Sequence, residues 1–431
     1  MTQAANPTTA TPTTSTVRAR VVAVDAARGV ALIGMLAVHS LYEADVAGKA
    51  TWSYAIFGGR AAATFAVLSG VGIAFTTGRQ RVRVVAVGGT VMALITRALI
   101  IGAIGLAIGE FSDATKGANV LPYYAVLFLL AIPLVFLPTW VIAALGVLVA
   151  GGAPVLTHLQ LPHLPVLNLL DPTVGYLVHH PLVLLSRLLI TGEYPALPWT
   201  AYLCAGLVIG RLTLSKRGVA IGLLGTGLVL AFAAAIVSTT LLNRYGGLAH
   251  IWAAQDGSQL TIPETTEMLT LGGSGTTPTS TWWWLAVNAP HTSSPFDLVG
   301  TTGAATALLG AMLLFSHLSA PRLLRRAITL SMAPLAAAGS MPLTLYTAHL
   351  AFINSDYDSY DPTNGFLLQV AVALLFGLGW RATAGRGPLE SLVTALATRA
   401  RRWATDTAPP STDPVSGAQL THLVATGEGS R

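Results

Sequence analysis

Residues 24–39 read V-D-A-A-R-G-V-A-L-I-G-M-L-A-V-H, a run as apolar as a membrane-spanning helix that still carries Asp25, Arg28 and His39. On a helix these three side chains share one stripe of roughly 80°. Asp25 and His39 then lie about 21 Å apart along the axis. Because polar groups are costly inside a membrane, we expect this face to line a cavity or to contact another polar element.

The whole chain has the composition of a membrane protein. Of its 431 residues, 53% are hydrophobic and only 10% are charged, whereas a soluble protein carries about 25% charged residues. The mean hydropathy is +0.64. The single cysteine, Cys204, excludes an intrachain disulfide and a cysteine metal cluster. The net charge of +6 resides mainly in basic loops, so we expect no nucleic-acid partner.

Ten segments have the apolar length of about 17–25 residues that a spanning helix requires. The sequence therefore predicts an all-α fold, a polytopic integral membrane helix bundle of about ten transmembrane helices. The segments are 24–42, 54–77, 84–109, 120–137, 140–156, 199–214, 219–242, 301–318, 332–353 and 365–383. An eleventh candidate, 174–190, contains Pro181 and Arg187. We interpret it as an interfacial or re-entrant helix, and a spanning helix there would make eleven.

Basic residues gather in alternate loops, as the positive-inside rule requires if both termini are cytoplasmic. Two outer loops, 157–198 and 243–300, are long enough to suggest a functional role. Residues 1–20 and 403–431 are rich in small and polar residues and are predicted to be disordered tails. They flank a single transmembrane domain over 21–402.

The histidines gather on the outer side of this topology, and only His317 and His422 of the ten are cytoplasmic. His39 and His349 lie near the outer ends of their helices, and His291 lies in an outer loop. Imidazole suits general base or nucleophile roles because it titrates near neutrality. The alternative is that these residues, with Tyr346 on the face of His349, are hydrogen-bonded packing groups. Pro342, on the same face, is expected to kink its helix.

The basic side chains near the membrane also allow two interpretations. Asp25 and Arg28 either form an ion pair at the cytoplasmic interface or hold an anionic ligand. Arg97 lies in the middle of an apolar run, where a charge costs about 2.5–3.5 kcal/mol. We expect Arg97 to face the protein interior and to pair with a carboxylate or a ligand. No metal site is expected, because no metal-binding motif is present.

Several stretches resemble a known family. The run at 24–39 resembles the first-helix signature of the heparan-alpha-glucosaminide N-acetyltransferase-like membrane acyltransferases, in particular actinobacterial-type members. Further matching stretches are G-R-A-A-A-T-F-A-V-L-S-G-V-G-I-A at 59–74, T-G-E-Y-P-A-L-P-W-T-A-Y-L-C-A-G-L-V-I-G-R at 191–211, A-P-H-T-S-S-P-F-D at 289–297, G-S-M-P-L-T-L-Y-T-A-H at 339–349 and G-R-G-P-L-E at 385–390. The resemblance covers about residues 20–395.

The resemblance implies a multi-pass plasma-membrane enzyme. It would move an acyl group, expected to be acetyl, from cytosolic acyl-CoA (acetyl-CoA) to an amino-sugar or glycan acceptor on the far side. The eukaryotic acetyltransferases of this family carry their key histidine in the loop after helix one, beside a tryptophan, whereas the loop at 41–57 has Trp52 but no histidine. His39, His291 and His349 therefore stay open as the catalytic group, with Tyr346 assisting. Arg28, supported by Asp25, and Arg97 would bind the CoA. The other expected partner is the lipid bilayer, and a homodimer is left open.

Two other classes of function also fit a polar face inside a helix bundle. A transporter or flippase would use the face as a pathway and would need no covalent chemistry. A structural membrane protein would act only by binding partners. The sequence shows no internal repeat of the kind many secondary transporters carry, which favours the acyltransferase.

Overall fold

A computed structural model describes residues 22–83, 87–164, 171–317 and 322–406. Within those ranges every regular element is a helix, and one isolated bridge pairs Ala44 with Ala50. The predicted tails at 1–20 and 407–431 lie outside the described residues. Residues 403–406 of the predicted C-terminal tail belong to the last helix, α17 (Pro388–Asp406).

Within the described ranges, seven helices or continuous helical stretches are long and apolar enough to cross a membrane. They are α1 (Val22–Ser40), α2 (Trp52–Phe57) with α3 (Arg60–Thr76), α4 (Val87–Gly109), α6 (Thr139–Gln160), α10 (Arg217–Asn243), α13 (Pro295–Ser316) and α16 (Pro362–Thr383). An eighth span is possible if α14 (Arg322–Ala338) and α15 (Pro342–Ile353) count as one. The all-α, polytopic prediction is confirmed, while the number ten and the side of each terminus remain predictions.

The two remaining predicted spans are short helices. Helix α5 (Leu121–Leu134) has 14 residues and α9 (Ala196–Arg211) has 16. At 1.5 Å per residue they reach about 21–24 Å, less than the roughly 30 Å hydrocarbon core. The predicted span 120–137 is longer than α5 because Val135, Phe136 and Leu137 continue the apolar run. The predicted span 199–214 has the same length as α9 but lies three residues further along the chain.

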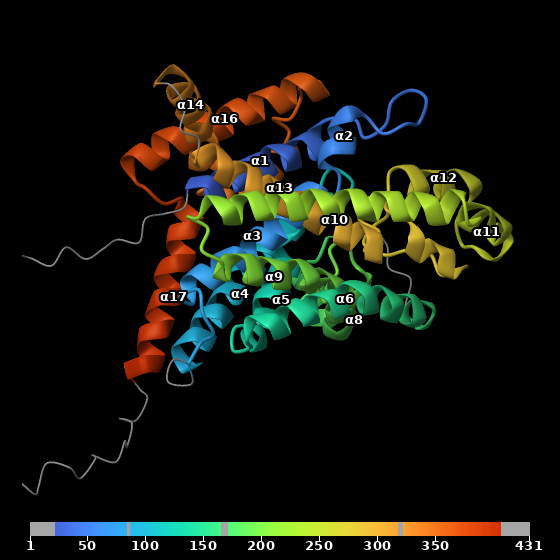
Figure 1. The fold of residues 1–431 in the computed structure, drawn as a ribbon, viewed down its shortest axis with the longest axis horizontal. Coiled ribbons are helices and arrows are strands. Elements are labelled where there is room, and N and C mark those ends of the chain that lie inside the picture. Colours follow the sequence, from blue (N-terminus) through green and yellow to red (C-terminus); the bar gives the residue numbers. More distant parts are fainter. Residues whose placement is uncertain (1–21, 84–86, 165–170, 318–321, 407–431) are drawn as a thin grey trace, which may run out of the picture.

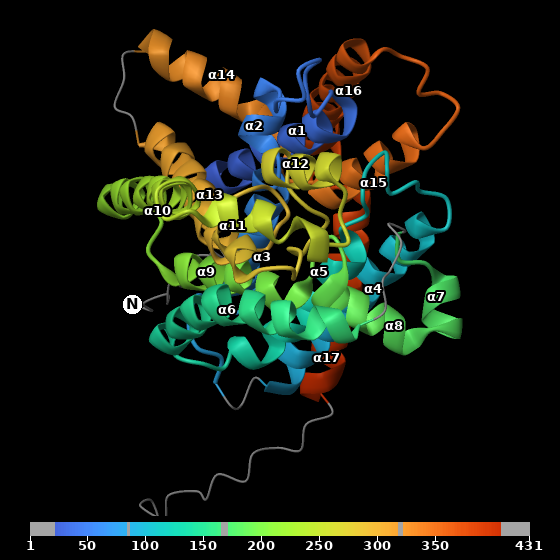
Figure 2. The same ribbon diagram turned by 90° about the vertical axis from the view of Figure 1, so that its right-hand side faces the viewer.

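The long helices run side by side, as Figure 1 shows, and Figure 2 looks along the bundle from one end. Helix α17 crosses the other end, beside the start of α10. We call this the basic end, because Arg211, Arg217, Arg381 and the arginines of α17 occur in the segments that meet there. Helices α11 (Gly247–Ala253) and α12 (Ile262–Thr270) cover the opposite end, which we call the far end.

Glycines allow the helices of the core to approach closely. A Cβ atom on Gly70 of α3 would lie 2.5 Å from the Leu203 carbonyl oxygen of α9, and Gly206 opposes Val67 in the same crossing. A Cβ on Gly105 of α4 would lie 2.6 Å from Pro122 of α5. Such small residues at helix crossings are typical of close packing between membrane helices.

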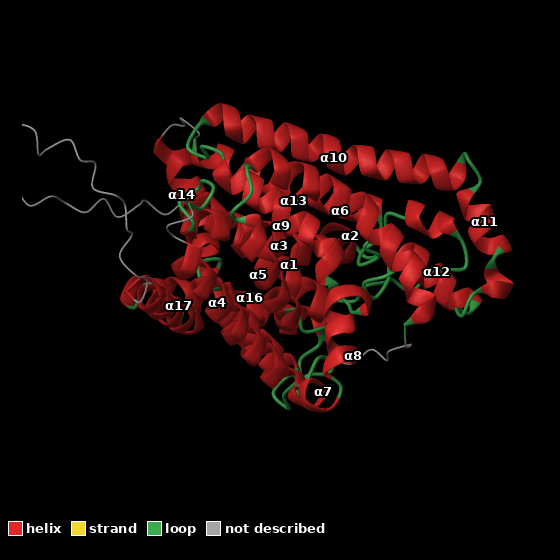
Figure 3. Ribbon diagram, turned by 90° about the horizontal axis from the view of Figure 1, so that it is seen from below, coloured by secondary structure: helices red, strands yellow, loops and turns green. Residues whose placement is uncertain are grey.

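Prolines break two of the predicted helices. Pro342 begins α15, and the axes of α14 and α15 differ by 71°, which confirms the predicted kink. The segment 174–190 is divided by Pro181 into α7 (Val174–His179), α8 (Pro181–Ser186) and a π-helical turn, η3 (Arg187–Thr191). Figure 3 shows α7 and α8 at the side of the bundle away from α10. The outer loop at 243–300 also contains a 3-10 turn, η5 (Trp282–Ala286).

Candidate active site

The polar start of α1 forms the predicted ion pair. Arg28 Nη1 lies 3.1 Å from Asp25 Oδ1, and Arg28 Nη2 donates to the Leu68 carbonyl oxygen at 3.1 Å. Gly72 lies alongside, because a Cβ atom there would be 3.0 Å from Arg28 Nη2. The pair fixes the guanidinium at the junction of α1 and α3, where it borders a cavity.

This cavity has a volume of about 680 Å³, within the usual range of small-molecule sites. Arg28, Arg79, Arg97 and Arg386 are among its lining residues. The remaining walls are largely apolar and come from α1, α3, α4, α5, α15 and α17. A site with several guanidiniums and an apolar interior suits a ligand with phosphates at one end and an uncharged arm at the other.

Arg97 faces this cavity, as its position in an apolar run predicts. In the part of the chain that the structure describes, no carboxylate lies within ion-pair distance of its guanidinium. The charged groups that act on it most strongly are Arg401 and Arg386, which are also positive. The carboxylate, one of the two partners predicted for Arg97, is therefore not found there, although Asp25 and Glu390 also line the cavity.

His39 and His349 are in direct contact, although 310 residues separate them in the sequence. His39 Nδ1 lies 2.9 Å from His349 Nε2, and the two rings are stacked with centroids 5.1 Å apart. His349 Nδ1 lies 2.5 Å from Gln369 Oε1, and Gln369 Nε2 donates to Ser40 Oγ at 3.1 Å. One hydrogen-bonded relay thus connects α1, α15 and α16.

With Gln369 Oε1 placed against His349 Nδ1, the relay assigns one tautomer to each histidine. A carbonyl oxygen only accepts, so His349 Nδ1 carries a proton and its Nε2 accepts when the ring is neutral. His39 then donates from Nδ1, which leaves a lone pair on His39 Nε2. A partner that orients one ring nitrogen in this way prepares the other for base or nucleophile chemistry.

The cavity ends one helical turn from this histidine pair. Met35 of α1 and Tyr346 of α15 are its lining residues nearest in sequence to His39 and His349, which corresponds to about 5–6 Å of helical rise. The segment 117–120 lies beside both. A Cβ on Gly117 would lie 2.9 Å from His39 Nδ1, and Tyr346 Oη contacts the Val120 amide and the Ala118 carbonyl oxygen at 3.2 Å each.

His291 belongs to a second cluster. Its Nδ1 lies 3.8 Å from Glu193 Oε1, and the Tyr194 ring packs edge-on against its ring with centroids 5.4 Å apart. The backbone is left-handed at His291 (φ 54°) and at Ser293 (φ 47°). Such strain costs non-glycine residues about 1–3 kcal/mol and often marks a functional site.

The two clusters are connected through one peptide group. Tyr194 donates its hydroxyl proton to the Ala118 carbonyl oxygen at 3.3 Å, the same oxygen that Tyr346 contacts. His39, His349, Tyr346 and His291 are therefore gathered around the segment 117–120, on the side away from Asp25 and Arg28.

Burial sets the charge state of the second cluster. Burial lowers the pKa of the His291 imidazole to about 4. Burial, together with the charge of Glu43, raises the pKa of Glu193 to about 8. At neutral pH both side chains are thus uncharged, with a proton on Glu193 and a lone pair on His291. Such a pair can accept one proton and donate another without building up net charge.

Three residues of this region, Gln369, Glu193 and Tyr194, are not predicted from the sequence. The sequence pattern could have identified Gln369 as a candidate site residue, because it is an isolated polar residue in an apolar span. Glu193 and Tyr194 occur in the quoted stretch at 191–211, but no spacing connects them to His291. Among the described residues no group of three or more His, Cys, Asp or Glu side chains is placed to hold a metal ion.

A comparison with protein families finds a match to the first half of the chain. The profile of the heparan-alpha-glucosaminide N-acetyltransferase catalytic domain matches residues 20–245, more than half of the chain. The chain belongs to this family. No curated protein matches the sequence. The protein is therefore a multi-pass membrane acetyltransferase, as the resemblance implied.

The family match divides the candidate site. The matched residues of this N-acetyltransferase include Arg28, His39, Arg97 and Glu193. His291, Tyr346, His349 and Gln369, and the whole of α17, come from the remainder of the chain. The second half of the acetyltransferase therefore supplies the groups that orient His39 and enclose the site.

Proposed function

We propose that the protein transfers an acetyl group from cytosolic acetyl-CoA to an amino-sugar or glycan acceptor on the extracytoplasmic side of the plasma membrane. The cavity carries this proposal. It has arginines for the phosphates of a CoA ester, and it ends one helical turn from two histidines that form a relay. The family match favours acetyl transfer over a transporter or flippase.

On the donor side, Arg28, Arg97 and Arg386 bind the CoA phosphates, and Asp25 holds Arg28 in place. The apolar wall between them and Met35 accommodates the pantetheine arm. Tyr346 keeps the segment 117–120 in position through its hydroxyl group. The thioester is thereby delivered near His39 Nε2.

His39 acts on the thioester in one of two ways. As a general base it removes the proton of the acceptor amine while the amine nitrogen attacks the carbonyl carbon. As a nucleophile it first forms an N–C bond to the acetyl group, and the amine then displaces the imidazole. In both cases the C–S bond breaks, CoA leaves as the thiol, and the acceptor gains an amide. His349 and Gln369 position His39.

The second cluster lies on the acceptor side. His291 Nδ1 has no hydrogen-bond partner within the described ranges, so it is available to an acceptor group. Glu193 and Tyr194 surround it and supply further polar atoms. We assign these residues to binding the acceptor beside His39.

Labelled acetyl-CoA, glucosamine as acceptor and the full chain in nanodiscs test the proposal. We expect CoA release and labelled amide with the wild type, and loss of both with His39→Ala. His179→Ala, in the exposed helix α7, is the matched control and keeps activity. A histidine adduct found by mass spectrometry when acceptor is omitted selects the nucleophilic route. Full transfer by His39→Ala contradicts the assigned role, and glucosamine flux without CoA release supports a transporter.

A further inference from the structure

Helix α17 differs from the other long helices because it crosses the basic end of the bundle (Figures 1 and 3). Glu390 fixes its start, since the Thr344 backbone N–H donates to this carboxylate at 3.1 Å. Val393 and Ala397 are buried, and Arg401 lies over Gly89 of α4. Helix α17 therefore packs against the bundle along one of its faces.

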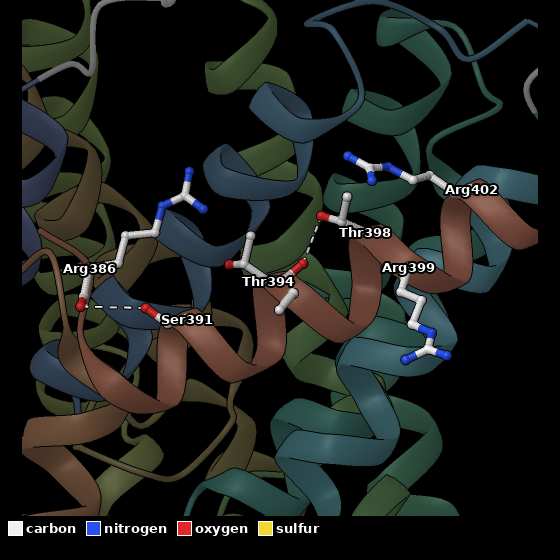
Figure 4. A pocket seen from close by; sticks show the side chains of 7 residues that line it. Arg386, Ser391, Thr394, Thr398, Arg399 and Arg402 are labelled. Atoms are coloured by element: carbon white, nitrogen blue, oxygen red, sulfur yellow. Dashed lines mark hydrogen bonds between the residues drawn. The ribbon is translucent and has the colours of Figure 1, made fainter. Parts of the chain in front are cut away.

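One side of α17 carries a groove of about 480 Å³. It is lined by Arg386, Ser391, Thr394, Ala395, Thr398, Arg399 and Arg402. Figure 4 shows Arg386 and Arg402 on the same side of the helix, with Thr394 and Thr398 between them, while Arg399 points away. With no carboxylate among its lining residues, the groove suits a phosphate group.

An apolar stripe runs beside the groove. Leu392, Leu396 and Trp403 are 46%, 40% and 61% exposed, and their spacings of four and seven residues place them on one side of the helix. Arg399 lies between this stripe and the groove in the helical order. An exposed apolar stripe with tryptophan and flanking arginines is typical of helices that lie in a membrane interface.

We propose that α17 lies in the headgroup layer at the basic end and that its groove binds the phosphate of an anionic phospholipid. The acyl chains of that lipid cover Leu392, Leu396 and Trp403. The positive-inside rule places this end at the cytoplasmic leaflet, which carries anionic lipid. A soluble nucleotide would match the arginines but would leave the apolar stripe in water, so the lipid accounts for both features.

The bound lipid would lie at the mouth of the donor cavity. Arg386 and Thr394 line both the groove and the cavity. Arg399 and Arg402 line the groove but not the cavity, so substitutions there test the lipid site separately from the proposed acetyl transfer.

Native mass spectrometry of the full chain, with phosphatidylglycerol or phosphatidylcholine added, tests the lipid site. We expect the wild type to retain phosphatidylglycerol preferentially. Arg399→Ala with Arg402→Ala lowers that retention roughly thirty-fold, because each arginine near an anionic surface contributes about 1 kcal/mol. Arg402→Gln, which keeps a polar side chain of similar reach, also lowers it. Arg217→Ala, an exposed arginine at the same end, is the matched control and retains the lipid.

Three results would overturn the lipid site. The first is equal retention of the two lipids by the wild type. The second is the same loss of phosphatidylglycerol in Arg217→Ala as in the double variant. The third is weaker CoA binding by the double variant, measured by calorimetry, with unchanged lipid retention, which would make the groove a nucleotide site. Brominated phospholipid should also quench the fluorescence of Trp403, which is identified as the part of the signal that Trp403→Phe removes. If this fluorescence is not quenched, the placement of α17 in the headgroup layer is contradicted.

Discussion

The substitution Gly117→Ala tests the position of His39 without touching the imidazole itself. A Cβ atom at residue 117 would lie 2.9 Å from His39 Nδ1, 3.0 Å from Cγ and 3.2 Å from Cε1, whereas ordinary contacts begin at 3.4 Å. The ring must therefore retreat by roughly 0.5 Å or more, because a packed interior has little free space. The 2.9 Å contact between His39 and His349 would then approach the limit of a hydrogen bond.

The expected result is a loss of turnover with little loss of donor binding. A misplacement of about 1 Å can cost 10²-fold in rate, so we expect kcat to fall roughly ten- to a hundred-fold. The KM for acetyl-CoA should stay unchanged, because Gly117 is outside the lining of the donor cavity. Overpacking should also lower the free energy of unfolding by about 1–3 kcal/mol. Transfer of labelled acetyl groups in nanodiscs measures kcat and KM, and thermal unfolding measures the stability.

Gly222→Ala provides the matched control, since no atom lies within 4 Å of a Cβ at that position of α10. This variant should keep the wild-type kcat. Wild-type kcat in Gly117→Ala would refute the assigned role of His39, and an equal loss in both variants would show that the effect is not specific to the site.

Three further changes test the relay, the donor cavity and the acceptor cluster. Gln369→Leu removes the acceptor for His349 Nδ1, so kcat should fall at constant KM, and acetyl-transfer kinetics measure both. Arg97→Leu should raise the KM for acetyl-CoA at least tenfold, because a hydrogen bond to a charged group contributes about 1.5–3 kcal/mol, while Arg97→Lys keeps part of the affinity. The pKa of Glu193 rises on burial from 4.5 to about 8, so between these pH values the folded protein holds the extra proton. Its contribution to stability therefore falls as pH rises through this range, and thermal unfolding of Glu193→Gln should lack that slope.

The fold was largely predictable because membrane helices are encoded by local hydropathy. Each of the ten predicted spans contains helix, and the charge pattern placed the basic loops at one end. The stripe on α1 was also predictable, since helical periodicity alone brings Asp25 and Arg28 together. The bounds of α5 and α9 were not, because a hydropathy window does not show where the backbone enters or leaves the helix.

The contacts that complete the candidate site could not be predicted in the same way. His39 meets His349 only because α1 and α15 are packed together, and no local pattern reports that packing. The carboxylate expected beside Arg97 is missing from the described residues for a related reason. Helical position shows that a charge faces inward, but tertiary structure decides which groups it meets.

The chemistry of the relay follows from its place in the membrane. A buried carboxylate behind His349 would orient the ring, but removing a charge from water costs several kcal/mol unless it is paired. The Gln369 amide supplies the same acceptor oxygen without charge, and its nitrogen is satisfied by Ser40. Because Gln369 orients the ring of His349 without a charge, His39 Nε2 keeps a lone pair, which the proposed acetyl transfer would use. Loss of kcat in Gln369→Leu at full acetyl-CoA affinity would therefore identify orientation of His39 as the contribution of α16.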